Sequence, residues 1–103
     1  MTTPTLTSKQ KQYLKGLAHP LSPLVQIGKE GITDALAEAV DAALAHHELI
    51  KVRVRETSPL ERSECGEALA GALRASVVQE IGRVVVLYRR HAEKPKIVLP
   101  KPA

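Results

Sequence analysis

The chain has 103 residues, a formal net charge of +4 and 44% apolar residues, a size and composition that suit one domain with a modest core. It has no apolar run near the roughly 20 residues that span a bilayer, no secretory signal pattern at its start and a single cysteine, so we expect a cytoplasmic protein with no membrane partner. With no Phe, no Trp and two Tyr, it lacks the aromatic residues that single-strand binding modules use for base stacking.

After an N-terminal extension over residues 1–5, the pattern predicts a helix over 8–18. Thr7 and Gln10 match a capping box at its start. This segment carries three lysines and no acidic residue, which suggests a surface for an anionic partner as readily as a solvated face: Lys9, Lys11 and Lys15.

A short apolar strand over 24–27, a glycine-bracketed loop and a helix over 33–46 follow. The loop consists of Gly28, Lys29, Glu30 and Gly31, and is called the GxxG loop below. Glycines allow a tight turn and close approach of another molecule, and the N-terminus of the following helix, near Thr33, favours anions. We therefore predict that the four loop residues and Thr33 contact a phosphate backbone.

A GxxG loop by itself is not specific for nucleic-acid binding. Such a pair of glycines is common, and no Gly-Lys-Ser/Thr follows at the spacing of a nucleotide-binding P-loop. Glu30 and Asp34 would also repel phosphate, and Lys29 offsets Glu30 only locally. Affinity for a polyanion must then draw on charges elsewhere in the chain.

The segment 48–55 alternates between apolar and basic residues, which predicts a strand with one covered face and one open face. Ile50, Val52 and Val54 belong to the covered face. The open face carries a basic row that is either solvated or a binding surface, depending on whether it lies beside the GxxG loop: Lys51, Arg53 and Arg55.

The third helix is expected over 59–74, because Ser58, Pro59 and Glu61 resemble a capped helix start. Two strands over 76–81 and 83–90 should form a hairpin around Gly82, and the continuous apolar centre of the second indicates an interior strand. Three arginines in or flanking this strand complete the nominated basic surface: Arg83, Arg89 and Arg90.

The element order αβαβαββ predicts an α/β (α+β) fold, a single compact domain over 6–91 with a four-stranded mixed sheet backed by helices. Residues 92–103 form a Pro- and Lys-bearing tail that we expect to be extended and mobile, with residues 97–99 able to dock on the body. Neighbouring His46 and His47 fit a helix end better than a metal site, and Cys65 fits a buried small residue better than a nucleophile. We predict neither a metal nor a cofactor.

The chain resembles the CRM domain family (chloroplast RNA splicing and ribosome maturation), specifically its short stand-alone bacterial YhbY-like proteins. The matching segments are residues 6–19, Ile27-Gly28-Lys29-Glu30-Gly31-Ile32-Thr33, residues 46–52 and residues 81–89. The resemblance implies a fold similar to the C-terminal domain of translation initiation factor three, and RNA binding without catalysis. It also implies association with precursors of the large ribosomal subunit, and it maps the family's GxxG loop onto residues 28–31.

We therefore expect a non-catalytic protein that binds ribosomal RNA in a pre-ribosomal particle, with no small-molecule substrate. Two alternatives remain at this stage. The acidic stripe of the second helix, or residues 97–99, could dock on a ribosomal protein or an assembly factor. A small enzyme acting on RNA would need a catalytic arrangement that the residue pattern does not display.

Overall fold

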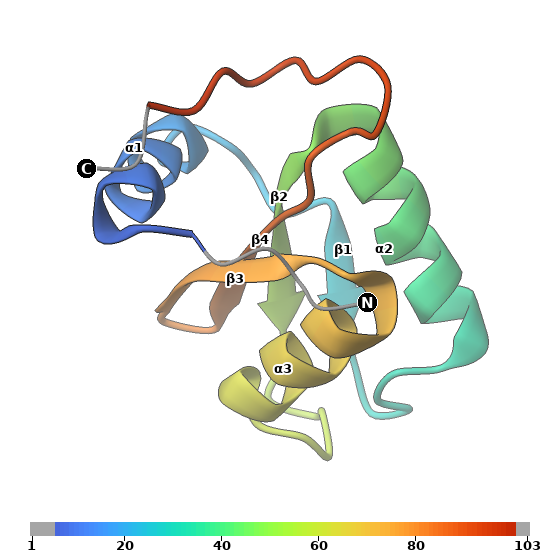
Figure 1. Cartoon of the computed structure of the whole chain (residues 1–103). Helices are drawn as coiled ribbons and strands as arrows, with labels where there is room; N and C mark the ends of the chain where they lie inside the picture. Colours follow the sequence, from blue (N-terminus) through green and yellow to red (C-terminus); the bar gives the residue numbers. More distant parts are fainter. Residues whose placement is uncertain (1–5, 101–103) are drawn as a thin grey trace.

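The computed structural model describes residues 6–100. The expected extension over 1–5 and the last three residues of the expected tail lie outside this range. The elements follow the predicted order (Figure 1): α1 (Ser8–Ala18), β1 (Val25–Ile27), α2 (Asp34–His47), β2 (Leu49–Val54), α3 (Arg62–Leu73), β3 (Ser76–Ile81) and β4 (Val84–Tyr88). In the described part of the chain, no helix combines the length and the apolar character that crossing a membrane requires.

The four strands form one mixed sheet in the order β1-β2-β4-β3. β1 runs parallel to β2, whereas β4 is antiparallel to both of its neighbours. Four of the five residues of β4 are buried, which confirms the predicted interior strand. Gly82, at a φ of +56°, makes the predicted hairpin turn between β3 and β4, a backbone conformation that suits glycine.

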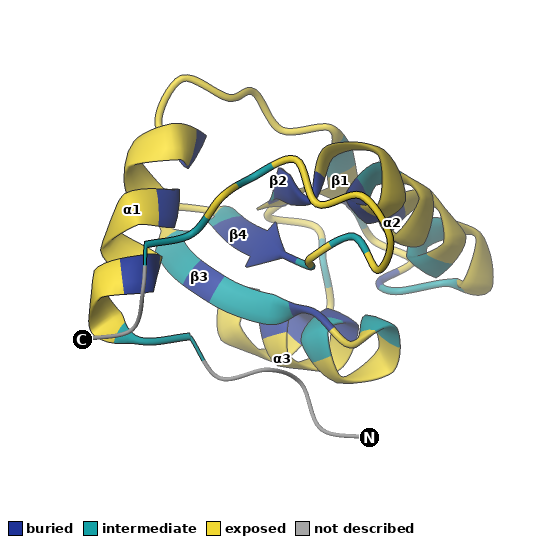
Figure 2. Cartoon of the chain, turned by 45° about the horizontal axis from the view of Figure 1, so that its top comes forward, coloured by how far each residue is buried: buried dark blue, intermediate teal, exposed yellow. Residues whose placement is uncertain are grey.

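Helices cover both faces of the sheet (Figure 2). On one face α2 contacts β1 and β2, and α3 contacts β3 and β4, which buries a core that includes Ile27, Leu44 and Leu87. On the other face α1 contacts β2 and β3 and encloses a second core with Leu14, Val86 and other residues. The face of the 48–55 strand that was predicted to be open is exposed at Arg53 and Arg55. The prediction was wrong at the other end of this face, where Leu49 is buried in the second core with Val86 and Tyr88 of β4.

Local signals placed the first two helices correctly. Thr7 caps α1 in a capping box with Gln10, and the Thr33 hydroxyl accepts a hydrogen bond from the N–H of Leu36 at the start of α2, at 3.1 Å. The prediction that the third helix starts at residue 59 was wrong: α3 begins at Arg62, with Glu61 as its N-cap. Ser58 instead closes a turn, in which its hydroxyl oxygen accepts a hydrogen bond from the N–H of Leu60.

The tail after β4 is anchored by a buried carboxylate. Glu48, 1% exposed, accepts hydrogen bonds from the backbone N–H groups of His91 (2.8 Å), Lys96 (2.6 Å) and Ile97 (2.8 Å). The side chains of Ile97 and Leu99 pack against the second core, which confirms the predicted docking. The segment drawn in red in Figure 1 is therefore a strap that returns from α2 to α1.

Candidate nucleic-acid interface

The GxxG loop lies at the sheet edge where β1 and β2 end and β4 begins. Ile27 pairs with Val54 at the ends of the parallel strands, and the N–H of Val54 donates to the carbonyl of Arg83 at 2.7 Å, just before β4. The chain segments that follow β1 and β2 and precede β4 therefore meet at this edge. The sheet pairing alone brings the GxxG loop beside basic residues from two other parts of the sequence.

The two glycines of the loop have different roles. Gly31 has a φ of +69°, and a methyl group added to it would lie 3.2 Å from the ring of Pro59. Its N–H donates to the carbonyl of Gly28 at 3.0 Å, which closes the turn. Gly28 has room: the nearest atom to an added methyl group is the Thr57 hydroxyl, at 3.9 Å. The backbone conformation thus requires glycine at position 31. At position 28 the absence of a side chain leaves the backbone of the loop accessible to another molecule.

The loop presents polar backbone to solvent. Lys29 and Glu30 are both exposed, and within residues 6–100 their backbone N–H groups donate no hydrogen bond. They lie just before the N-terminus of α2, where the helix dipole adds a partial positive charge. The residues around the loop line a shallow cleft of about 290 Å³, called the loop cleft below: Gln26, Gly28, Lys29, Glu30, Gly31, Thr33 and Leu36.

A second and larger cleft adjoins the first. It has a volume of about 460 Å³ and is called the arginine cleft; its lining residues are Gln26, Arg53, Arg55, Glu56, Thr57 and Arg83. Three guanidinium groups face one carboxylate here. Arg83 lies 3.5 Å from Glu56, whose side chain is 80% exposed, and Arg53 makes no ion pair within the described residues. Exposed pairs of this kind are weak, so the cleft keeps a positive potential.

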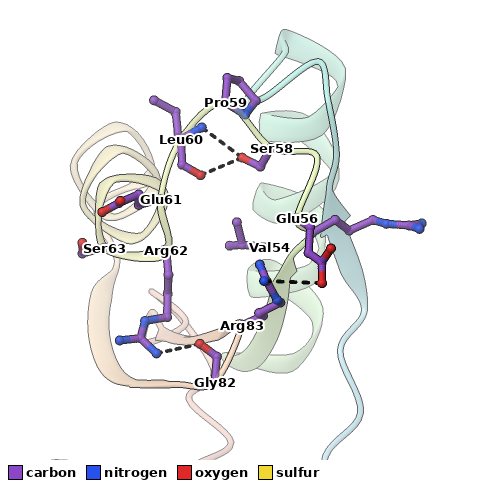
Figure 3. A pocket seen from close by; sticks show the side chains of 11 residues that line it. Val54, Glu56, Ser58, Pro59, Leu60, Glu61, Arg62, Ser63, Gly82 and Arg83 are labelled. Atoms are coloured by element: carbon purple, nitrogen blue, oxygen red, sulfur yellow. Dashed lines mark hydrogen bonds and ion pairs between the residues drawn. The ribbon is translucent and has the colours of Figure 1, made fainter.

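A third cleft continues from the arginine cleft toward the β3–β4 turn (Figure 3). Arg62 of α3 points across it and donates to the carbonyl of Gly82 at 2.6 Å, and it also pairs with Glu80 at 3.3 Å. The Arg62 guanidinium is therefore already engaged by an acceptor and a carboxylate of the protein itself. Apart from Lys29, which lies beside Glu30 in the loop cleft, the available positive charge at this edge lies in the arginine cleft.

The remaining predicted residues lie elsewhere. Lys51 donates through its ammonium to the carbonyl of His19, at 3.2 Å, near the C-terminal end of α1. Arg89 binds Asp41 at 2.6 Å and the carbonyl of Leu73 at 3.0 Å. Arg89 and Arg90 follow β4 and so lie at the opposite end of the sheet from the GxxG loop. The exposed lysines of α1 occupy the helix that covers the second core: Lys9, Lys11 and Lys15.

Tyr88, Cys65 and the two neighbouring histidines are in structural positions. Tyr88 is 4% exposed and belongs to the second core, so it has no surface for base stacking. Cys65 is fully buried, and burial raises the pKa of its thiol. His46 and His47 form the last turn of α2. Within residues 6–100 no three potential metal-ligating side chains lie together.

Sequence reasoning missed Gln26 and Thr57, which line this interface. Gln26 is the exposed residue between the two buried or half-buried apolar residues of β1, and it pairs with Arg53 in the sheet register. An apolar–polar–apolar triplet beside a glycine loop is the signal that could have drawn attention to Gln26. The sequence did not show that Gln26 pairs with Arg53 on β2, because this pairing depends on the sheet register.

Comparison with known proteins agrees with this architecture. The family model described as the CRS1 / YhbY (CRM) domain matches residues 6–89. A protein named "RNA-binding protein" from Haemophilus influenzae is 44% identical over 97 residues, which cover 94% of this chain and 97% of that protein. "Probable RNA-binding protein YqeI" from Bacillus subtilis is 40% identical over 95 residues, covering 92% and 99% of the two chains.

A solved structure shows the same fold. The solution structure of the hypothetical protein SAV1595 from Staphylococcus aureus has a TM-score of 0.79 and 43% sequence identity, and it covers 93% of this chain and 100% of that one. The family model, the full-length relatives and this structural match all extend over the sheet, its three helices and the GxxG loop. The chain therefore belongs to the CRS1 / YhbY (CRM) domain family.

Proposed function

We propose that this protein is a non-catalytic RNA-binding protein that binds ribosomal RNA of large-subunit precursors in the cytoplasm during ribosome assembly. The observation that carries the RNA-binding part is the position of the GxxG loop: its free backbone N–H groups lie beside the arginine cleft, at one edge of the sheet. Relatives of similar length are named RNA-binding proteins. The ribosomal target follows from the resemblance of the chain to its family.

The chemistry of the edge suits a sugar-phosphate backbone. The absence of side chains at Gly28 and Gly31 lets a strand approach the loop closely. The N–H groups of Lys29 and Glu30 donate no hydrogen bond within residues 6–100, so they are available to phosphate oxygens. Arginines bind phosphate with two parallel hydrogen bonds. Tyr88 is buried, and the exposed Tyr13 belongs to α1 and lines neither cleft. Base stacking therefore contributes little at this edge, and recognition relies on phosphates, sugars and RNA shape.

The loop can be tested with two matched pairs of variants. Lys29→Glu should weaken RNA binding strongly, whereas Lys94→Glu, the same charge change on an exposed lysine of the tail, should have little effect. Gly28→Leu should block close approach without disturbing the fold, because no atom lies within 3.9 Å of an added methyl group. Gly16→Leu, at an exposed site on α1 with no atom within 4 Å, is its control.

Binding is measured by fluorescence anisotropy with labelled RNA over a series of salt concentrations. Phosphate contacts predict a steep loss of affinity with salt. A flat salt response, or equal binding by each variant and its control, would remove this mechanism.

The ribosomal target is tested in cells. Crosslinking followed by sequencing of the attached RNA should enrich ribosomal RNA of large-subunit precursors. Crosslinks spread over unrelated transcripts would refute the target while leaving RNA binding intact. Protein partners that remain bound after nuclease treatment would instead support a protein-interaction module, and turnover of RNA by the purified protein would refute the non-catalytic assignment.

A further inference from the structure

The loop cleft is short of positive charge. Lys29 is accompanied by Glu30, and Asp34 lies in the first turn of α2, so the side chains around the loop do not attract a polyanion by themselves. The loop supplies hydrogen-bond donors, and the attracting field has to come from a neighbouring surface. The arginine cleft adjoins the loop cleft and has an excess of positive charge, because its three arginines are accompanied by a single acidic residue, Glu56.

The loop cleft and the arginine cleft form one continuous surface. Gln26 lines both of them, and the hydroxyl of Thr57 in the arginine cleft is the nearest atom to a methyl group added at Gly28 of the loop, at 3.9 Å. In the sheet Gln26 is level with Arg53, and Arg53 is level with Val84. The strands that carry these three positions span two strand spacings, about 10 Å.

Gln26 lies between the GxxG loop and the arginine cleft, so it can contact the part of a bound strand that lies between two phosphates. It is exposed, and the guanidinium of Arg55 donates to its side-chain oxygen at 3.5 Å. The amide oxygen is the acceptor in this contact, so the NH₂ group of Gln26 is free to donate to another partner. A neutral amide gains little from phosphate charge, but it hydrogen-bonds well to a ribose hydroxyl or a base edge.

We propose that one RNA strand runs from the GxxG loop into the arginine cleft, where Arg53 and Arg83 bind its phosphates, and that Gln26 contacts the sugar or base of the nucleotide between the two clefts. This inference rests on the proposed function and specifies the path of the RNA. The arginines at the far end of the sheet and the lysines of α1 lie outside this path. Gln26 is then a specificity-determining contact on a surface otherwise built for phosphates.

The salt dependence of binding separates the two kinds of contact. Each phosphate contact on a single strand contributes about 0.7 to the slope of log affinity against log salt. The variant Arg53→Ala/Arg83→Ala should therefore lower the slope by about 1.4 and weaken binding at least tenfold near physiological salt. Gln26→Ala should weaken binding about fivefold, the value of one neutral hydrogen bond of about 1 kcal/mol, with an unchanged slope.

The control is Arg74→Asn, which removes an exposed arginine at the opposite end of the sheet. Arg74 has a φ of +56°, and asparagine tolerates that backbone conformation. The probe is an unstructured single-stranded RNA of about 10 nucleotides, with a duplex of the same sequence as competitor. Circular dichroism confirms that each variant is folded.

Three outcomes would overturn the proposed path. The first is that Arg53→Ala/Arg83→Ala binds RNA like Arg74→Asn. The second is that Gln26→Ala changes the salt slope or leaves the affinity unchanged. The third is that the duplex competes as strongly as the single strand. If the wild-type protein binds the RNA and Lys29→Glu abolishes binding while the arginine variants do not, the path is wrong and the proposed function stands. If the wild-type protein does not bind RNA at all, the proposed function fails as well.

Discussion

Replacing Glu48 by glutamine tests how strongly the strap is held. The carboxylate accepts three backbone hydrogen bonds from the strap, two at one oxygen and one at the other. Glutamine keeps the shape but has one acceptor oxygen, so its NH₂ group would face at least one of these N–H donors. Hydrogen bonds to charged groups contribute about 1.5–3 kcal/mol each, and a buried donor left without a partner costs about 1–3 kcal/mol.

We expect Glu48→Gln to lower the free energy of unfolding by about 2–4 kcal/mol, a large part of the roughly 5–15 kcal/mol typical of a domain. The midpoint of thermal unfolding should fall by about 10–20 °C for a chain of this size. The assay is thermal and urea unfolding at neutral pH, followed by far-ultraviolet circular dichroism. Glu93→Gln, an exposed acid within the same strap, is the control. Stabilities of the two variants within about 0.5 kcal/mol of each other would refute the anchoring argument.

Two further predictions concern stability. Burial acts to raise the pKa of the Glu48 carboxyl, but the N–H groups of the strap outweigh burial and hold that pKa below its ordinary value. The stability due to this carboxylate is therefore fully present above about pH 4.3 and is lost as the pH falls through the lowered pKa. Acid titration of unfolding should show the difference between wild type and Glu48→Gln shrinking below pH 4, and a constant difference would contradict the assignment. In α3, a methyl group added at Gly66 would lie 3.1 Å from Val85, a fully buried residue of β4, so Gly66→Ala should destabilise the protein by about 1 kcal/mol despite the better helix propensity of alanine. Gly71→Ala, with no atom within 4 Å of the added group, should stabilise it by about 0.5–1 kcal/mol in urea unfolding, and equal effects of the two substitutions would show that packing at Gly66 does not matter.

Errors in the sequence reading occurred where a local signal competed with a tertiary contact. Ser58-Pro59-Leu60-Glu61 satisfies the statistics of a helix start, yet the turn there packs Pro59 against Gly31, and α3 begins three residues later. The alternation of β2 correctly predicted which residues face α2. It did not show that the other face is shared between α1 and solvent, because that division depends on where a distant helix packs.

Short-range patterns were enough to determine the order of the elements, the caps at Thr7 and Thr33 and the GxxG loop. Each of these depends on residues close together in the chain, where backbone propensity and side-chain periodicity act directly. Only the tertiary structure decided which cations join the loop, because the register that sets Gln26 beside Arg53 pairs residues 27 positions apart. The same is true of the strap, since Glu48 and Ile97 are separated by 49 residues, and only chain folding brings a buried carboxylate to the N–H groups that stabilise it.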